Sequence, residues 1–337
     1  MKLKIKNTGM KFFFITLTIE GREKILSKLI SEQSRPALTH YGEVVKATLI
    51  AMHGEFPCVT ISDFVIMPDH LHFIMIVDYS KNRFFSPLWA AHRLMDATEA
   101  IWGTNGDFAP EPQKALAEAI TLAHKNLGSL TISNRSLTTA IKWNRHCYIE
   151  LSFDSQQLKT IRRYIRLNPA RAIWKASHPN RFICFSNIKH PILDPSRSWD
   201  AMGNLTLLGS PFLHHVRLTM SKTTKEHSLE INKIINQTQQ GLIPVCGFIS
   251  PGEKELLRHL KATPNARFIK IIPFALPPHY DPSAEDSREL AADRMLILSG
   301  FPQGTIDTRQ NLRTRCNIMN NLAAKLCTNA QILGTTQ

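Results

Sequence analysis

The sequence predicts an α+β protein in which a sheet of β-α-β-β-α-β type comes first and a smaller α/β unit follows. The chain has 337 residues, enough to bury a sizeable core and to form two domains. Short apolar segments at 11–19, 57–66 and 70–77 are typical of strands, and apolar residues recur at helical spacing over 36–53. This order of elements predicts the front of a ferredoxin-like sheet.

Two histidines stand at the start of the predicted strand 70–77. Proline is tolerated only at the start or edge of a strand, so Pro68 places His70 and His72 where that strand begins. Alternation puts both histidines on one face of the sheet and Leu71 on the other. Two imidazoles side by side at the rim of a sheet can share one divalent cation, although such a pair is more often solvated or hydrogen-bonded.

A second group of polar residues lies on a helix predicted over 154–169. A polar residue caps its start, and Pro169 is expected to end it. Tyr164 and Asn168 are four residues apart, so they lie on the same face, one turn from each other. A tyrosine nucleophile and an amide oxygen ligand placed in this way can meet the same metal-bound phosphate.

The two motifs together resemble those of the HUH single-tyrosine transposases. His-hydrophobic-His after Met-Pro-acidic at 67–72, followed by Tyr-Ile-x-Leu-Asn-Pro at 164–169, is similar to the REP-associated tyrosine transposases, relatives of the insertion-sequence transposases. The resemblance extends over roughly residues 10–190. Weaker similarities to that family occur in the first strand, ahead of the tyrosine helix and after Asn-Pro, at 11–18, 143–148 and 170–172.

This resemblance implies a transposase that cleaves and rejoins single-stranded or hairpin-bearing DNA through a 5′-phosphotyrosine. Carried over residue by residue, His70, His72 and Asn168 bind one Mg²⁺ or Mn²⁺, and Tyr164 attacks the phosphorus. A free tyrosine has a pKa of about 10, so the nucleophile needs a nearby cation, for which the metal or Arg163 and Arg166 are candidates. The residues expected to contact DNA are Arg163, Arg166, Arg171, Lys142 and Arg145.

The charge of the chain is consistent with a polyanionic partner such as DNA. There are 41 Lys and Arg residues against 27 Asp and Glu, a net charge of +14, and the pI is near 9.6. Residues 1–190 hold 25 basic and 15 acidic residues, and residues 191–337 hold 16 and 12. The half that carries the motifs is therefore the more basic half, although a basic surface alone does not establish DNA binding.

Four parts are expected along the chain. They are an HUH nuclease domain at 1–190, a helical insertion within it at about 80–142, a connecting segment at 191–240 and a small α/β domain at 241–330. In the last part, strand-helix-strand-helix-strand predicts a Rossmann-like unit. It has neither G-x-G-x-x-G nor a P-loop, and Ser250 with Glu253 forms a capping box that explains its first turn structurally. No role is predicted for it.

Cellular context follows from the cysteines and from the first residues. None of the six cysteines is spaced as C-x-x-C, so neither a zinc ribbon nor a disulfide framework is expected. The apolar run at 12–19 is short for a signal peptide, no cleavage site follows it, and nothing is long enough for a membrane span. We expect a cytoplasmic protein of bacterial type that acts on the chromosome. Whether a homodimer forms is open.

Two other functions stay open at this level. One is a nucleic-acid-binding regulator that keeps the fold but does not cut, and the other is a metal-dependent nuclease that uses water as the nucleophile. The intact set of His70, His72, Tyr164 and Asn168 argues against both. Among the tyrosines, Tyr148 is the nearest competitor for the nucleophile, but it is expected to begin a strand.

Overall fold

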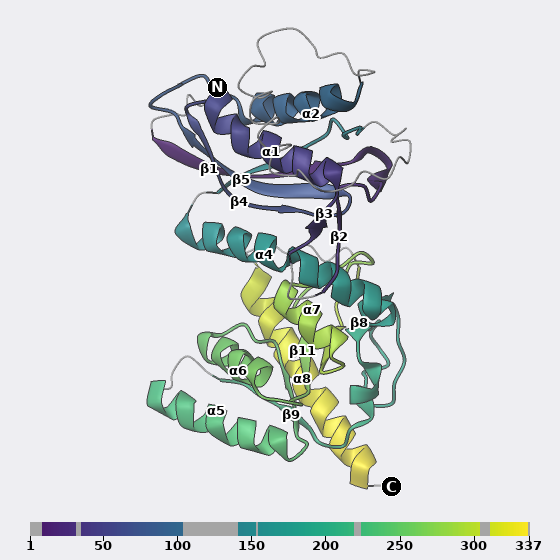
Figure 1. Ribbon diagram of the computed structural model, residues 1–337. Helices are drawn as coiled ribbons and strands as arrows, with labels where there is room; N and C mark the ends of the chain where they lie inside the picture. Colours follow the sequence, from purple (N-terminus) through teal and green to yellow (C-terminus); the bar gives the residue numbers. More distant parts are fainter. Residues whose placement is uncertain are drawn as a thin grey trace. The chain divides into compact units, whose positions relative to one another are not determined.

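The computed structural model describes residues 9–31, 35–103, 141–152, 154–218, 224–303 and 311–335. Within these ranges, the chain forms two compact units that divide at Ile173 and Trp174 (Figure 1). The sequence places the boundary near residue 190. The difference arises because Cys184 and Phe185, which come before residue 190, already form a strand of the second unit's sheet.

The first unit is built on a four-stranded sheet in the order β4-β5-β1-β6, and every neighbouring pair is antiparallel. Its elements are β1 (Met10–Thr18), β2 (Ser27–Lys28), β3 (Ala37–Leu38), α1 (His40–Glu55), β4 (Val59–Ile66), β5 (His70–Asp78), α2 (Pro87–Gly103), β6 (Tyr148–Ser152) and α4 (Ser155–Ser177). The predicted strands and the first helix are confirmed to within a few residues. A short 3-10 turn, η1 (Glu20–Arg22), follows β1, and β2 pairs with β3 as a separate ladder.

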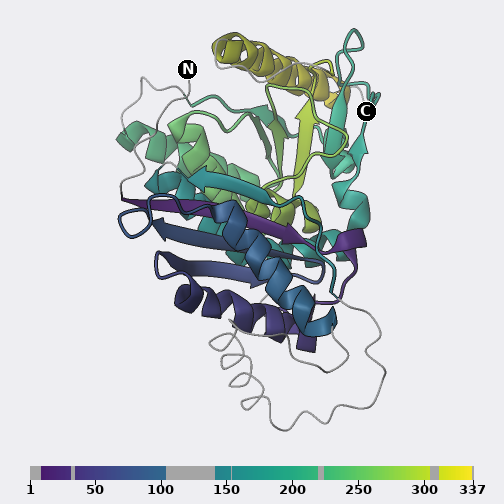
Figure 2. The same cartoon turned by 90° about the horizontal axis from the view of Figure 1, so that it is seen from above.

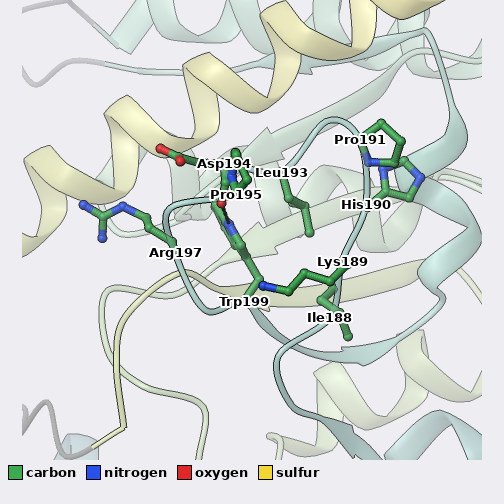
Figure 3. A pocket seen from close by; sticks show the side chains of 9 residues that line it. All are labelled: Ile188, Lys189, His190, Pro191, Leu193, Asp194, Pro195, Arg197 and Trp199. Atoms are coloured by element: carbon green, nitrogen blue, oxygen red, sulfur yellow. Dashed lines mark hydrogen bonds between the residues drawn. The ribbon is translucent and has the colours of Figure 1, made fainter.

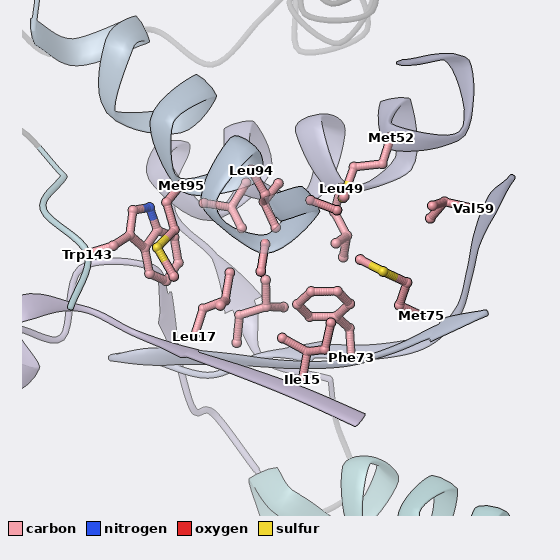
Figure 4. Close-up of a cluster of buried hydrophobic side chains, with 14 of the residues drawn as sticks. Ile15, Leu17, Leu49, Met52, Val59, Phe73, Met75, Leu94, Met95 and Trp143 are labelled. Carbon is pink, nitrogen blue, oxygen red and sulfur yellow. The ribbon is translucent and has the colours of Figure 1, made fainter. Parts of the chain in front are cut away.

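Alternation along the strands gives the sheet two apolar faces. On one face, Ile15 and Phe73 pack beneath Leu49 of α1 and Leu94 of α2, as Figure 4 shows. These two helices run across the same face (Figure 2). The other face carries Phe14 and the residues that pack against α4. Phe14 pairs with Ile74, which follows His72 by two residues and His70 by four on β5. Alternate residues of a strand project from the same face, so both histidines lie on the face that packs against α4.

Helix α4 does not end at Pro169, so the predicted end of this helix is wrong. The proline lies inside the helix, which continues to Ser177. An internal proline removes one backbone hydrogen bond and disfavours helix for the residue before it. Burial of Ala170, Arg171 and Trp174 beyond the proline offsets that cost here. The extra turns matter because they bring Arg171 onto the same side of the helix as Tyr164.

The second unit has a six-stranded sheet in the order β7-β8-β12-β11-β10-β9. The four strands from β9 to β12 are parallel, and β8 and β7 extend the sheet in antiparallel pairs. Its elements are η2 (Pro179–Phe182), β7 (Cys184–Phe185), β8 (Asp200–Gly203), η3 (Leu205–Gly209), β9 (Leu213–His215), α5 (Thr224–Gln239), β10 (Ile243–Cys246), α6 (Pro251–Ala262), β11 (Phe268–Ile271), α7 (Ala284–Ala291), β12 (Met295–Ser299) and α8 (Leu312–Thr335). Helices α5, α6 and α7 pack on one face and α8 on the other.

The segment expected as a connection, 191–240, instead supplies β8 and β9 to this sheet. Both strands are too short to show a periodic pattern, and all four residues of β8 are buried. The helices and strands predicted after residue 240 are confirmed, including the capping box of Ser250 and Glu253. Most of the insertion expected at about 80–142 lies outside the described residues.

Two further expectations concern the whole described chain. All six cysteines are free thiols, as the sequence predicts. None of the described helices combines the length and the apolar character that a membrane span requires.

Candidate active site

The two histidines are positioned by the tight turn between β4 and β5. Pro68 and Asp69 form this turn, which closes when the Met67 amide donates to the His70 carbonyl at 2.8 Å. The Pro68 carbonyl accepts from the Leu26 amide at 2.9 Å, which anchors the turn to the segment before β2. Strand β5 therefore begins at His70, as the proline signal predicts.

Each histidine has its Nδ1 atom engaged by a neighbouring side chain. His72 Nδ1 lies 2.8 Å from Thr16 Oγ1 on β1, and His70 Nδ1 lies 2.5 Å from Asp69 Oδ1. The two imidazole rings are 4.6 Å apart between centroids. When Nδ1 carries the proton in both rings, it donates to Thr16 and Asp69, and both Nε2 atoms keep their lone pairs for another partner.

Burial keeps both imidazoles neutral. It lowers the pKa of His72 to about 3, helped by the neighbouring His70 and by the cations of Arg171 and Arg22. Burial also lowers the pKa of His70, against the opposing effect of Asp69. The contact between His70 and Asp69 is therefore a hydrogen bond of a neutral ring to a carboxylate rather than an ion pair. Neutral imidazole is the form that binds metals.

Tyr164 is held over the histidines by α4. Ile161 and Ile165 of α4 are buried against the sheet. Tyr164, which lies between them in sequence, is partly buried and packs against the same cluster. Its hydroxyl oxygen is 3.5 Å from His72 Nε2, and the two rings are 5.2 Å apart between centroids. Phe14 of β1 stacks on His72 at 5.4 Å and meets the Tyr164 ring edge-on at 5.9 Å. The expected nucleophile and the histidine pair therefore come together.

Asn168 and Arg171 follow Tyr164 along the inner side of α4. Asn168 is one turn after Tyr164 and is 7% exposed. The sequence predicts Arg171 as a DNA contact, but its side chain is 6% exposed, and its guanidinium carbon lies 5.1 Å from the centre of the Tyr164 ring. Stacking of a guanidinium on an aromatic face is a favourable cation–π contact, so Arg171 supports the tyrosine from within the unit.

The other four expected DNA contacts lie at the surface. Arg163 and Arg166 of α4 are exposed, and so is Lys142. Arg145 is exposed too, but its guanidinium is paired with Asp96 and Glu99 of α2. Contact of these four side chains with DNA stays a prediction.

Three residues around the site, Thr16, Asp69 and Phe14, have no role in the sequence-based interpretation. Arg171 has another role there, as a DNA contact, and not as a support of the tyrosine ring. Asp69 follows the proline in the Met-Pro-acidic motif, so its acidic character could have indicated a partner for the adjacent His70. Thr16 and Phe14 depend on the register between β1 and β5, in which Thr16 lies opposite His72. That register cannot be read from one strand alone.

The two imidazoles are held in the way that metal-binding histidines commonly are. Metal-binding histidines commonly donate their other ring N–H to a carboxylate or another oxygen, as His70 and His72 can to Asp69 and Thr16. In the part of the chain that the structure covers, no group of three or more His, Cys, Asp or Glu side chains is arranged to hold a metal. The expected set differs from such groups because its third member is the amide of Asn168.

A pocket of about 260 Å³ lies in the second unit, lined by residues between Ile188 and Trp199 (Figure 3). Several of its polar groups are engaged in hydrogen bonds. Asp194 accepts from the amide and hydroxyl of Ser196, Arg197 donates to the Gly300 carbonyl, and Trp199 donates from Nε1 to the Asp194 carbonyl. These contacts stabilise the loop before β8, and the pocket holds no arrangement comparable to the histidine pair.

Comparison with known proteins gives remote likenesses. No family model matches the chain. An uncharacterized protein of Haemophilus influenzae is 28% identical over 159 residues, which are 47% of this chain and 79% of that protein. A solved structure of a REP-associated tyrosine transposase bound to a REP hairpin shares 16% identity over 52% of this chain and 73% of that one, with a TM-score of 0.25.

Two more solved structures show the same level of likeness. A putative transposase from Deinococcus radiodurans shares 12% identity over 49% of this chain and 95% of that one, with a TM-score of 0.25. DNA processing protein A from Helicobacter pylori shares 17% identity over 45% of this chain and 79% of that one, with a TM-score of 0.33. Likenesses this remote do not assign the chain to a family.

Proposed function

We propose that the chain is a transposase of the HUH type, a metal-assisted DNA nuclease and strand transferase in which Tyr164 is the nucleophile. The observation that carries the proposal is the placement of the Tyr164 hydroxyl 3.5 Å from Nε2 of His72, with His70 alongside. The antiparallel strand order β4-β5-β1-β6, with α1 and α2 together on one face, supports a ferredoxin-like sheet, and α4 packs on the other face. The second unit is proposed as a Rossmann-like domain on the basis of its parallel strands β9 to β12.

His70, His72 and Asn168 would hold Mg²⁺ or Mn²⁺ at this site. When bound, the cation would polarise the scissile phosphate and stabilise charge on the departing 3′ oxygen. Asp69 and Thr16 would fix the orientation of the two imidazoles that hold it. Because both rings are already neutral at physiological pH, neither has to lose a proton before it can bind a metal.

Tyr164 supplies the covalent step. Its Oη forms a bond to phosphorus as the bond from phosphorus to the 3′ oxygen breaks, which gives a 5′-phosphotyrosine and a free 3′-OH. The phenol loses its proton and the 3′ oxygen gains one, so no water is consumed. Attack by another 3′-OH reverses the step and joins strands. Because one phosphodiester replaces another of similar energy, the reaction needs no nucleoside triphosphate.

The local contacts favour Tyr164 over Tyr148 as the nucleophile. The Tyr148 hydroxyl donates to Glu150 Oε2 at 2.7 Å, and this hydrogen bond, with burial and the Glu150 charge, raises the pKa of Tyr148. Tyr164 instead faces His72 and carries the Arg171 guanidinium on its ring. The histidines and Tyr164 belong to one unit of one chain, which supports a site that works without a second subunit.

The test is a covalent-adduct assay. Single-stranded DNA with a hairpin, labelled in separate preparations at the 5′ and the 3′ end, is mixed with protein and Mn²⁺ or Mg²⁺ and then denatured. We expect a metal-dependent adduct that carries only the 3′ label, that disappears in Tyr164→Phe and His70→Ala, and that persists in Tyr148→Phe and in His178→Ala, an exposed histidine of the second unit.

Two results would overturn the proposal. Cleavage that survives Tyr164→Phe without an adduct indicates a nuclease that uses water. DNA binding with neither cleavage nor adduct, across several hairpins and both metals, indicates a regulator that does not cut.

A further inference from the structure

Tyr148 is a large aromatic side chain that stays exposed beside the proposed active site. It begins the edge strand β6, and 55% of its surface is accessible. Thr16 of β1 lies opposite Tyr148 on one side and opposite His72 on the other. Residues directly opposite each other in a sheet project from the same face. Tyr148 therefore emerges on the face that carries the histidines and α4.

The exposed ring is held in place from two directions. Its hydroxyl donates to Glu150 Oε2 at 2.7 Å, and Gln157 Nε2, in the first turn of α4, donates to Glu150 Oε1 at 2.8 Å. Phe14 meets the Tyr148 ring edge-on with 6.2 Å between centroids. A side chain ordered before binding loses little conformational entropy when a ligand packs on it. Both Glu150 oxygens accept hydrogen bonds, which reduces the repulsion between this carboxylate and a nearby phosphate.

Phe14 also connects Tyr148 to the reacting group. The same phenylalanine ring contacts Tyr164 at 5.9 Å and His72 at 5.4 Å. One aromatic ring thus separates the exposed tyrosine from the proposed nucleophile. A DNA strand whose phosphate reaches Tyr164 would pass its neighbouring nucleotides over this edge of the sheet.

We propose that Tyr148 is a stacking platform for a base that flanks the phosphate attacked by Tyr164, an inference that rests on the function proposed above. Every base has an aromatic face, so stacking fixes the position of a single strand without reading its sequence. The phenolic hydroxyl anchors the ring to Glu150, and the ring itself makes the contact with the base. Duplex DNA keeps its bases stacked on each other, so the platform selects a single-stranded segment next to the cleavage point.

The test measures DNA binding in the Tyr164→Phe background, where cleavage does not interfere. The probe is a fluorescently labelled hairpin with single-stranded flanks of mixed sequence. Tyr148→Ala is expected to weaken binding by about 5- to 150-fold, the range that alanine substitution of a base-stacking aromatic produces. Tyr148→Phe keeps the ring and is expected to bind within about twofold of the parent. Phe84→Ala, at a residue 95% exposed elsewhere in the unit, serves as the matched control.

A second arm locates the base. An abasic nucleotide is moved through the positions on both sides of the cleavage point. At one position it should weaken binding by the parent protein and cause no further loss in Tyr148→Ala, because both changes remove the same contact. Unchanged binding by Tyr148→Ala, or losses that add at every abasic position, would overturn the platform.

The platform and the proposed function can fail separately. If the wild-type protein forms no adduct while the non-additive loss at one abasic position is observed, the platform stands and the tyrosine nuclease is rejected. If the adduct forms normally in Tyr148→Ala and binding is unchanged, the nuclease stands and the platform is rejected.

Discussion

The hydroxyl oxygen of Tyr164 on α4 lies 3.5 Å from Nε2 of His72 on β5, although the two residues are 92 positions apart in the chain. Their rings are 5.2 Å apart between centroids, and Phe14 contacts both. The distance is at the outer limit of a hydrogen bond. Catalytic contacts are often long in the absence of substrate and shorten when it binds.

Replacing Thr16 should weaken metal use through His72. Thr16→Val keeps the shape of the side chain but removes the oxygen that contacts Nδ1 at 2.8 Å, so the ring loses its fixed orientation and tautomer. The metal concentration for half-maximal adduct formation should rise by about 10- to 100-fold. Thr16→Ser retains the hydroxyl and should behave like the wild type. A rate that falls equally in both variants would indicate a packing defect instead.

Asp69 should serve His70 in the same way. Asp69→Ala removes the acceptor 2.5 Å from His70 Nδ1, and the apparent metal affinity should fall by about 10- to 100-fold. Arg22→Ala provides the matched control, because Arg22 reaches the same carboxylate at 3.4 Å from a side chain that is 65% exposed. Exposed pairs of this kind contribute little, so that variant should change the metal titration by less than about threefold. Equal effects in the two variants would contradict an orienting role for Asp69.

Arg171 should affect the rate of the covalent step without being required for it. Arg171→Met fills a similar volume but removes the cation over the Tyr164 ring, and adduct formation should slow by about 2- to 30-fold, the range of a cation–π contact. The measurement is single-turnover adduct formation at saturating DNA. Arg166→Met, on the exposed side of the same helix, should instead weaken DNA binding and leave the single-turnover rate nearly unchanged. A slower covalent step in Arg166→Met than in Arg171→Met would refute this division of roles.

The second unit should lose stability in acid through Asp286. Burial alone would raise the pKa of this carboxyl, but the ammonium groups of Lys270 and Lys261, at 2.7 and 2.8 Å, outweigh it and hold the pKa below its ordinary value. The carboxylate therefore stabilises the fold fully above the unfolded-state pKa of about 3.9. That contribution is lost as the pH falls through the lower folded-state pKa.

At pH 7, Asp286→Asn leaves two partly buried cations without their charge partner, so it should cost about 3–5 kcal/mol of unfolding free energy. Urea unfolding at pH 7 and pH 3 measures this cost, which should shrink at the lower pH. Asp281→Asn, in an exposed pair with Lys175, should change stability by less than about 1 kcal/mol. A cost for Asp286→Asn that is independent of pH would contradict the assignment.

Local signals in the sequence predict much of the first unit. Pro68 and the alternation after it place His70 and His72 at the start of a strand on one face, and the i, i+4 spacing places Tyr164 and Asn168 on one side of a helix. Each of these signals acts within a few residues. The contacts that fix the rings, such as Thr16 with His72, depend on pairing between strands far apart in sequence.

Proline and short strands explain the errors. Pro169 normally ends a helix, but burial of Trp174 and its neighbours continues α4 past it, and this continuation determines the position of Arg171. Strand β8, at Asp200–Gly203, is only four residues long and wholly buried, so it shows no alternation. Its membership in the sheet depends on pairing with β12, which a single sequence does not reveal.

The most direct measurement of the central claim identifies the amino acid that becomes attached to DNA. The adduct formed with Mn²⁺ is digested with protease and nuclease, and the nucleotide-bearing peptide is sequenced by mass spectrometry. We predict a nucleotide joined through its 5′ phosphate to Tyr164. Attachment at Tyr148 or at any other residue, or cleaved DNA with no modified peptide, would contradict the assignment of Tyr164 as the nucleophile.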